Sequence, residues 1–300
     1  MTEGSHSPGR KSGRPFLRGC VVILAALAGF FLLLGILSRM EGLSGIGAGK
    51  VGLVRITGLI AESESAIEQI RKFARDDSIQ AIVLRVNSPG GGVGPSQEIY
   101  EEVRKLRGKK VVVTSMGALA ASGGYYIACA SEKIYANPGT ITGSIGVIMN
   151  FVNVRDLVEK IGIRGMVVKS GEYKDIGSPV RDMKPGERRL LQGVIDNVHA
   201  QFVNAVAEGR GLDRKQVLAI ADGRIFSGEQ ARELGLVDTL GNLQDAVEEA
   251  GRMAKIEGEP KLVLPPKKRL SILELLRDEA KSIIDETLSQ PRFRFEYLAR

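Results

Sequence analysis

The chain has few of the residue types that often carry catalysis and metal binding. Among its 300 residues are two histidines and two cysteines, and tryptophan is absent. His6 falls in a tail rich in Ser, Gly, Pro and Arg, and His199 lies beside the apolar stripe of a predicted helix. Since neither histidine is placed to act as a base, the sequence argues against a Ser-His-Asp triad. So few ligands also leave no pattern for a metal site, and we expect no metal and no cofactor.

The two cysteines indicate neither a disulfide nor a nucleophile. Cys20 lies at the edge of a long apolar run, and Cys129 lies in an apolar, helix-like stretch. A catalytic cysteine needs a base nearby, and none is evident around Cys129. We therefore interpret Cys129 as a small buried hydrophobic residue, the usual role of a free cysteine.

Positive charge is in excess but is not organised for nucleic-acid binding. The formal net charge is +7, yet Lys and Arg are spread along the chain. No basic stripe with interleaved aromatic residues appears. Part of the excess flanks the apolar run, where membrane topology explains it. Nucleic acid is therefore not an expected partner.

One long uncharged run, residues 20–37, has the sequence CVVILAALAGFFLLLGIL. It is long enough to cross a bilayer as a helix, and it lacks the polar face expected of a core helix of this length. A cleaved signal peptide is the alternative, because small residues follow Leu37, but its apolar region would be shorter. We predict a retained transmembrane signal-anchor helix over residues 19–38.

The charges that flank this run predict its topology. Its N-terminal side carries Arg10, Lys11, Arg14 and Arg18, whereas only Arg39 stands close on the other side. Positive residues stay on the cytoplasmic side of a membrane helix. We therefore expect a single-pass protein of the cell membrane, with a cytoplasmic N-terminus and an extracytoplasmic folded domain.

The chain divides into five predicted parts. These are a disordered cytoplasmic tail at 1–18, the anchor at 19–38, a linker at 39–49, a folded domain at 50–264 and an amphipathic helical tail at 265–300. Within the folded domain, short apolar runs such as AIVLRV and VVVTS alternate with segments of helical period, among them 187–207, 222–236 and 242–254. This alternation predicts an α/β fold with a largely parallel sheet covered by helices.

The C-terminal tail has an apolar stripe at helical spacing, formed by Leu273, Leu276, Ala280, Ile284 and Leu288. One interpretation is a helix packed on its own domain or on a neighbouring subunit. An interfacial membrane helix is the other, because three basic residues precede the stripe at 267–269.

Two glycine-rich loops follow predicted strands, at residues 87–93 (NSPGGGV) and 116–125 (MGALAASGGY). Ligand sites of open α/β sheets lie at the carboxyl ends of strands. Consecutive glycines turn backbone N–H groups toward a ligand, but no complete phosphate-binding motif is present. These loops therefore predict either an oxyanion hole or structural turns.

Ser122 favours the oxyanion hole. It lies between small residues where a helix is predicted to begin, so the N–H of Gly123 and the helix dipole point toward it. A serine nucleophile needs a base and donors for the oxyanion. A helix-capping serine is the alternative, but it would not explain the second glycine-rich loop. We predict that Ser122 is a nucleophile.

With histidine excluded, lysine is the remaining candidate base. A lysine base must be neutral, and burial can lower the pKa of a lysine from about 10.4 to about 7–8. Most lysines here lie on charged helical faces, whereas residues 166–179 (MVVKSGEYKDIGSP) suggest a short strand and then a turn with two lysines. From chemistry alone, Lys169 and Lys174 are equally good candidates.

Four blocks stand in a fixed order: NSPGGGV at 87–93, AASGGYY at 120–126, TGSIGV at 142–147 and KSGEYKDIGSP at 169–179. Together they resemble the signal peptide peptidase A family, bacterial membrane-bound serine peptidases related to protease IV and the SohB-type enzymes. The resemblance covers about residues 50–264. SGEQARELGLVD at 227–238 resembles a segment of the wider Clp protease and crotonase-like fold.

The resemblance implies a serine endopeptidase with a Ser/Lys dyad. Ser122 matches the family's nucleophile, and Lys174, in G-x-Y-K-D, matches its general base, which selects Lys174 over Lys169. The family pattern further implies oxyanion N–H groups from Gly91 and Gly123.

Other implications of the resemblance concern assembly and substrate. Ser144, in TGSIG, would either orient the amine of Lys174 or serve as a turn serine. The family forms ring-like homo-oligomers whose active sites face an enclosed space, with Ser and Lys drawn from one chain or from adjacent subunits. Its substrates are extended apolar peptides, especially remnant signal peptides in the membrane. With the topology expected above, the domain would lie in the periplasm or on the outer face of a bacterium.

Two further functions compete with a peptidase. A crotonase-like acyl-CoA enzyme also uses glycine-rich oxyanion loops, but coenzyme A is expected in the cytoplasm rather than outside it. A non-catalytic, membrane-anchored assembly protein would need no reactive serine. Covalent labelling of Ser122 discriminates both from a peptidase.

Overall fold

The computed structural model describes residues 27, 29–32, 49–265 and 296–298, in two units that comprise Met1–Ala48 and Gly49–Arg300. Leu27 and residues 29–32 are helical, and the rest of the predicted anchor lies outside the described residues. Among the residues that the structure describes, no helix has the length and apolar character needed to cross a membrane. The apolar stripe predicted at 273–288 also lies outside the described residues.

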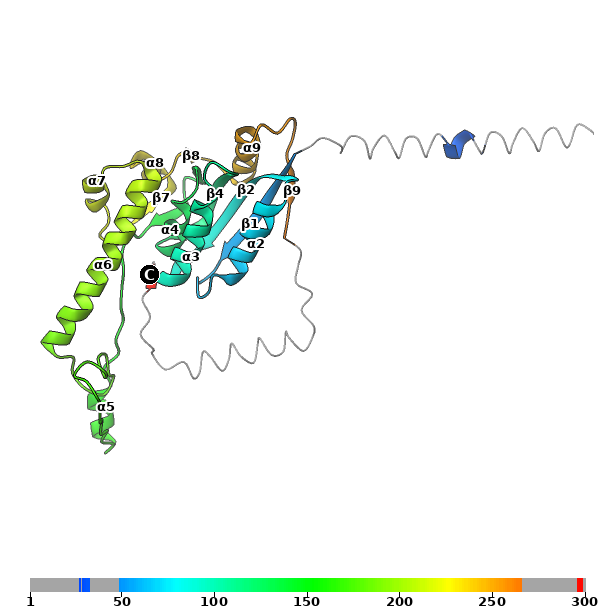
Figure 1. Ribbon diagram of the computed structural model, residues 1–300. Helices are drawn as coiled ribbons and strands as arrows, with labels where there is room; N and C mark the ends of the chain where they lie inside the picture. The colour runs from blue at the N-terminus through cyan, green and yellow to red at the C-terminus, as the bar shows by residue number, and fades with distance from the viewer. Residues whose placement is uncertain (1–26, 28, 33–48, 266–295, 299–300) are drawn as a thin grey trace, which may run out of the picture. The chain divides into compact units, whose positions relative to one another are not determined.

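An eight-stranded sheet forms the centre of the second unit (Figure 1). Its order is β7-β6-β4-β2-β1-β9, with β5 beside β4 and β8 beside β5. All strand pairs are parallel except β6 with β7. The predicted α/β fold with a largely parallel sheet is therefore confirmed. The strands are β1 (Lys50–Thr57), β2 (Ile79–Ser88), β4 (Val111–Ala121), β5 (Lys133–Ala136), β6 (Ile141–Gly143), β7 (Ile225–Ser227), β8 (Thr239–Leu240) and β9 (Lys261–Val263).

Helices cover both faces of this sheet, which explains the continuous apolar runs in its strands. On β2, Ile82 and Leu84 pack with residues of α2, α3, α4 and α6, while Ala81 and Val83 face the other way and pack with α9. The alternation follows from the two-residue period of a strand. The helices are α2 (Glu64–Arg75), α3 (Val93–Arg104), α4 (Gly123–Ala128), α6 (Pro185–Arg210) and α9 (Leu243–Met253).

Two secondary-structure predictions need correction. The helical character predicted for 222–236 holds only for α8 (Gly228–Glu233), because β7 precedes it and pairs with β6. The strand suggested at 166–169 does not form, and Met166 and Val168 are 91% and 94% exposed. An apolar run becomes a strand only when a neighbouring strand pairs with it, and no described strand does so here.

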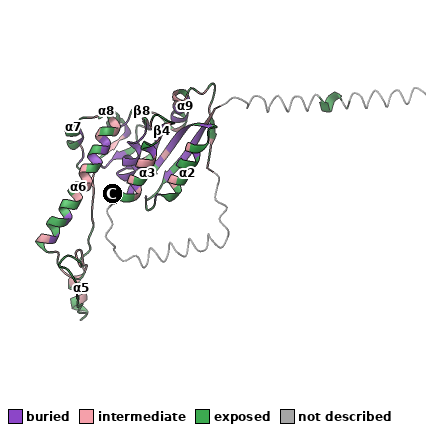
Figure 2. Cartoon of the chain, in the orientation of Figure 1, coloured by how far each residue is buried: buried purple, intermediate pink, exposed green. Residues whose placement is uncertain are grey.

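Residues 150–184, here called the arm, join β6 to α6 and contain α5 (Arg155–Lys160) as their one described helix. The arm lies at the N-terminal end of α6, away from the sheet (Figure 1). Figure 2 shows that it is mostly exposed or intermediate, in contrast to the buried strands. Apolar side chains of the arm face solvent in a single chain, namely Val152, Leu157, Ile161, Ile163, Met166, Val167 and Val168. Such a surface is typical of a protein interface.

A second, small sheet joins distant parts of the chain. β10 (Glu296–Leu298) pairs antiparallel with β3 (Gly90–Gly92), with Tyr297 opposite Gly91. β10 also lies against α4, the helix that follows Ser122. The C-terminal segment therefore occupies a strand edge of the predicted oxyanion loop.

The two residues interpreted as structural do have structural surroundings. Cys129 is fully buried, and burial raises the pKa of its thiol to about 12. His199 places Nε2 2.7 Å from the carbonyl oxygen of Ala221, which engages the ring in packing within the domain. Cys129 is therefore not available as a nucleophile, and one ring nitrogen of His199 is used within the fold.

Candidate active site

Ser122 lies at the junction between β4 and α4, in a strained backbone conformation. Its φ and ψ are 53° and −118°, a region that non-glycine residues rarely adopt. Its N–H donates to the Gly143 oxygen at 2.8 Å, and its carbonyl accepts from the Tyr126 N–H at 2.8 Å. Strain of this kind costs on the order of 1–3 kcal/mol and clusters at functional sites.

The hydroxyl of Ser122 has no partner. Ser122 is fully buried, and its Oγ is the buried side-chain polar atom left without a hydrogen bond among the described residues. The side chain makes no capping bond to α4, which removes the helix-capping alternative. A buried unsatisfied hydroxyl costs about 1–3 kcal/mol and calls for a functional explanation.

The three glycines of β3 use their N–H groups differently. Gly90 donates to Ser88 Oγ at 3.0 Å, and Gly92 donates to the Ile60 oxygen at 2.8 Å. Because successive residues of a strand point their N–H groups to opposite edges, the N–H of Gly91 points away from Ile60. It faces the edge where β10 lies.

Both predicted oxyanion glycines stand where a side chain would not fit. A Cβ on Gly91 would lie 2.3 Å from the Ile60 oxygen. On Gly123, a Cβ would lie 2.5 Å from Ser96 Oγ and 3.3 Å from the Gly91 nitrogen. The two glycines are therefore close to each other, at the start of the helix that Ser122 precedes.

Ser88 and Ser144 support this region. Ser88 donates its hydroxyl to the Gly58 oxygen at 2.6 Å and so fixes the loop that it also contacts at Gly90. Ser88 was not among the sequence-predicted site residues, although its place before Pro-Gly was a signal. Ser144 has a positive φ of 49°, is 5% exposed and follows Gly143, the residue that accepts from Ser122.

The two candidate lysines have different surroundings in the arm. Lys169 Nζ binds Asp175 Oδ1 at 2.5 Å and the Glu172 oxygen at 2.7 Å. Lys174 is exposed, and within the described residues no hydrogen bond or ion pair engages its amine. Of the two lysines, Lys169 therefore has its amine engaged within the arm, whereas the amine of Lys174 is open to a partner.

A single chain does not bring Ser122 and Lys174 together. The Ser122 hydroxyl has no hydrogen-bond partner, so the Lys174 amine is not within bonding distance of it. Among the described residues, no group of His, Cys, Asp or Glu can hold a metal ion.

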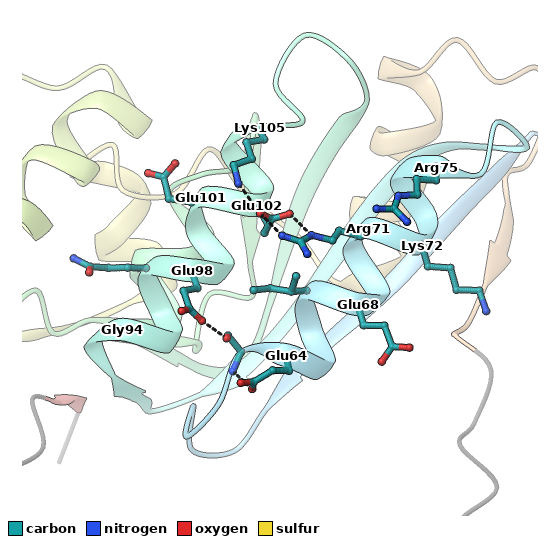
Figure 3. Close-up of a pocket in the computed structure, with 13 residues that line it drawn as sticks. Glu64, Glu68, Arg71, Lys72, Arg75, Gly94, Glu98, Glu101, Glu102 and Lys105 are labelled. Atoms are coloured by element: carbon teal, nitrogen blue, oxygen red, sulfur yellow. Dashed lines mark hydrogen bonds and ion pairs between the residues drawn. The ribbon is translucent and has the colours of Figure 1, made fainter.

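A separate pocket of about 1130 Å³ lies between α2 and α3 (Figure 3). Charged side chains line it, and Glu102 binds Arg71 at 2.7 Å and Lys105 at 2.6 Å. These bonds, first that from Arg71, lower the pKa of Glu102 to about 2. Since neither Ser122 nor Lys174 lines this pocket, it is not the candidate active site.

The mostly parallel sheet and the strained serine beside a glycine-rich strand define a Clp protease-like α/β fold. Residues 54–141 match the Clp protease family, and residues 104–257 match peptidase family S49. The chain belongs to peptidase family S49 and is therefore a peptidase, which confirms the resemblance to signal peptide peptidase A.

Known proteins of several lineages are similar. A relative from Synechocystis sp. is 46% identical over 209 residues, which are 69% of this chain and 76% of the relative. Protease 4 of Salmonella typhi is 38% identical over 65% of this chain, but only 31% of that longer protein is covered. The chloroplastic serine protease SPPA of Arabidopsis thaliana is 33% identical over 72% of this chain and 31% of its own length.

Proposed function

We propose that this peptidase is a serine endopeptidase with a Ser/Lys dyad. Ser122 is the nucleophile, Lys174 is the general base, and Gly91 and Gly123 donate their N–H groups to the oxyanion. The observation that carries the proposal is the buried, unpartnered Ser122 Oγ in a strained backbone. A hydroxyl held in this way at a cost in stability fits a nucleophile that awaits its base and substrate.

In the proposed mechanism, neutral Lys174 takes the proton of Ser122 as Oγ attacks a peptide carbonyl. The carbonyl oxygen becomes an oxyanion that accepts from the N–H groups of Gly91 and Gly123. The protonated amine then gives its proton to the leaving nitrogen, and the C–N bond breaks. Water, activated by Lys174, attacks the acyl-enzyme and releases the acid product and free Ser122. We assign Ser144 to orienting the amine.

We propose that the dyad forms between copies of the chain in a homo-oligomer. Within one chain the Ser122 hydroxyl is unpartnered, and the amine of Lys174 is exposed on the arm. The apolar side chains of the arm face solvent, as expected for an interface. Docking on a second copy would bury the amine, and burial disfavours the charged form of a lysine.

The proposed substrate is an extended apolar peptide, such as a remnant signal peptide. β10 supports this proposal, because it lies as an antiparallel strand along the edge of β3 to which Gly91 points. A peptide that adds to a sheet edge gains main-chain hydrogen bonds, and pockets then provide specificity. The uncharged run at 20–37 supports membrane anchoring, with the domain on the extracytoplasmic side.

A fluorophosphonate probe tests the proposal directly. We expect one probe molecule to attach to Ser122 of the native protein and none after heat denaturation, because the activated hydroxyl depends on the assembled site. Mass spectrometry of proteolytic peptides locates the adduct. The absence of any adduct on Ser122 would favour a non-catalytic assembly protein.

Removal of residues 296–300 is expected to lower KM for an added peptide about tenfold, because a tethered strand competes at an effective concentration in the millimolar range. kcat should change little. The free peptide EYLAR, with the sequence of these residues, serves as a control and should inhibit the shortened protein competitively. An unchanged KM would mean that β10 does not compete with substrate.

A further inference from the structure

Four charged residues of the arm and α6 form a continuous ion network next to Lys174. Lys169 binds Asp175 at 2.5 Å, Asp175 binds Arg181 at 2.9 Å, and Arg181 binds Glu187 at 2.5 Å. The side chains of Asp175 and Glu187 are only 14% and 1% exposed. We call this set the arm network. The arm network contains buried carboxylates, although most residues of the arm are exposed or only partly buried.

Arg181 is the centre of the arm network. Its Nε donates to Asp175 Oδ2, and its two terminal nitrogens donate to the Asp175 and Asp182 carbonyl oxygens and to both Glu187 carboxylate oxygens. These bonds use all five N–H donors of the guanidinium group. No other side chain offers this planar set of donors, so lysine is not an equivalent replacement.

Glu187 connects the arm network to the core. Its carboxylate also accepts from the Lys184 N–H at 2.9 Å and so caps the first turn of α6. At its other end, α6 packs Phe202 and Val206 into the hydrophobic core. One end of α6 is thus fixed in the core, and its other end binds Arg181 through Glu187. Arg181 in turn binds Asp175, in the turn that contains Lys174.

The turn around Lys174 depends on these bonds. Its backbone makes successive turn bonds, from Lys174 N–H to the Gly171 oxygen at 3.2 Å and from Ile176 N–H to the Tyr173 oxygen at 3.1 Å. Such turns are weak alone. Asp175, the neighbour of Lys174 in the chain, is held by three bonds from Arg181 and Lys169.

The arm network also keeps the carboxyl groups of Asp175 and Glu187 in their charged form. The guanidinium of Arg181 and the ammonium of Lys169 hold the pKa of Asp175 well below its usual range. The bond from Arg181, with the Lys184 N–H, lowers the pKa of Glu187 to about 2. Two cations and two carboxylates therefore neutralise one another, and the adjacent carboxylate of Asp175 is not left to pair with Lys174. The charged groups nearest in this turn and at the start of α6 are Lys169, Glu172, Asp175, Arg181, Asp182, Lys184, Glu187 and Arg188.

We propose that Arg181 is a positioning residue for the reaction: by binding Asp175 and Glu187 together, it fixes the Lys174 turn to the end of α6 and keeps Asp175 from becoming the counter-ion of the Lys174 amine. This inference rests on the proposed Ser/Lys function. It assigns to Arg181 a role that acts through Lys174 and not on the substrate.

Kinetics of Arg181→Gln test the positioning. We expect kcat to fall about 100-fold with KM changed less than threefold, since a misplacement of about 1 Å at a catalytic group costs about that much. Arg181→Lys should restore little of the loss, because one ammonium cannot make the five bonds. Arg155→Gln is the matched control. Arg155 lies in the same arm and pairs with Glu159 and Asp182 at the surface, so its loss should leave kcat unchanged.

A pH profile of kcat tests the charge effect separately. In Arg181→Gln the carboxylate of Asp175 loses its bonds to Arg181 and keeps only Lys169. It can then also stabilise the protonated amine of Lys174, so the acidic limb of the kcat profile should move up by about 1 pH unit. In the double variant Arg181→Gln/Asp175→Asn, the limb should return to its wild-type position while kcat stays low. A profile that does not move in the single variant, or does not return in the double variant, contradicts the charge effect.

Two measurements separate the possible failures. Thermal melting and light scattering, which report folding and assembly, should match for Arg181→Gln, Arg155→Gln and wild type. Should Arg181→Gln and Arg155→Gln lose activity and assembly alike, Arg181 is structural and the inference is wrong. Normal kcat in Arg181→Gln beside an inactive Lys174→Ala overturns the inference alone, whereas an active Lys174→Ala overturns the proposed function.

Discussion

Ser122→Ala is expected to lower peptidase activity by at least about 10⁴-fold, because without the nucleophile only binding and oxyanion stabilisation remain. The folded protein should be as stable as wild type or slightly more stable. The substitution removes a buried hydroxyl that has no hydrogen bond, and such a group costs about 1–3 kcal/mol. Peptide cleavage followed by mass spectrometry measures the activity, and urea unfolding measures the stability.

Ser131→Ala is the matched control for this prediction. Ser131 is buried like Ser122, but its hydroxyl bonds to Thr114 Oγ1 at 2.7 Å. Its loss should destabilise the fold by about 1–3 kcal/mol, since Thr114 then loses its partner, while the activity of the folded protein persists. Near-normal cleavage by Ser122→Ala would exclude this serine as the nucleophile.

Coexpression of Ser122→Ala with Lys174→Ala is expected to restore activity that each variant lacks alone. If Ser and Lys of one site come from different copies, a chain that keeps Ser122 can meet a chain that keeps Lys174. Random mixing makes this combination in about a quarter of the sites of a closed oligomer, so activity should reach about a quarter of the wild-type value. Distinct affinity tags on the two chains allow mixed assemblies to be isolated and assayed.

A second combination checks that result. Ser122→Ala coexpressed with the double variant Ser122→Ala/Lys174→Ala should stay inactive, because no chain supplies the nucleophile. Activity that never rises above that background in the first mixture would mean that both residues act within one chain. The arm would then have to fold back toward its own Ser122, and exposure of its apolar side chains would need another explanation.

Much of the site could be predicted because its signals are local. The apolar run AIVLRV predicted a strand buried on both faces. The scarcity of histidine favoured lysine as the base. The small residues around Ser122 placed it at the start of a helix, where the structure has it. The apolar residues at 166–168 gave a false strand signal, because periodicity does not reveal whether a neighbouring strand exists.

Other features depend on contacts between residues far apart in the chain, which no local pattern contains. The family resemblance implied Gly91, but the physical difference from Gly90 and Gly92 is visible only in the structure, where those two glycines donate to Ser88 and Ile60. Likewise, Lys169 and Lys174 were equivalent by chemistry until Asp175 was seen to engage Lys169.

The sequence by itself determined the α/β class, the nucleophile candidate and, through its four blocks, the family. Hydrophobic periodicity and short motifs involve residues that are close in the sequence, so they can be recognised without a structure. The tertiary structure decided which hydroxyl is left unsatisfied, which glycine N–H faces β10 and which ions neutralise one another. Each of these outcomes depends on which hydrogen-bond and ion-pair partners a group finds. Many of those partners lie far away in the sequence and become neighbours only when the chain folds.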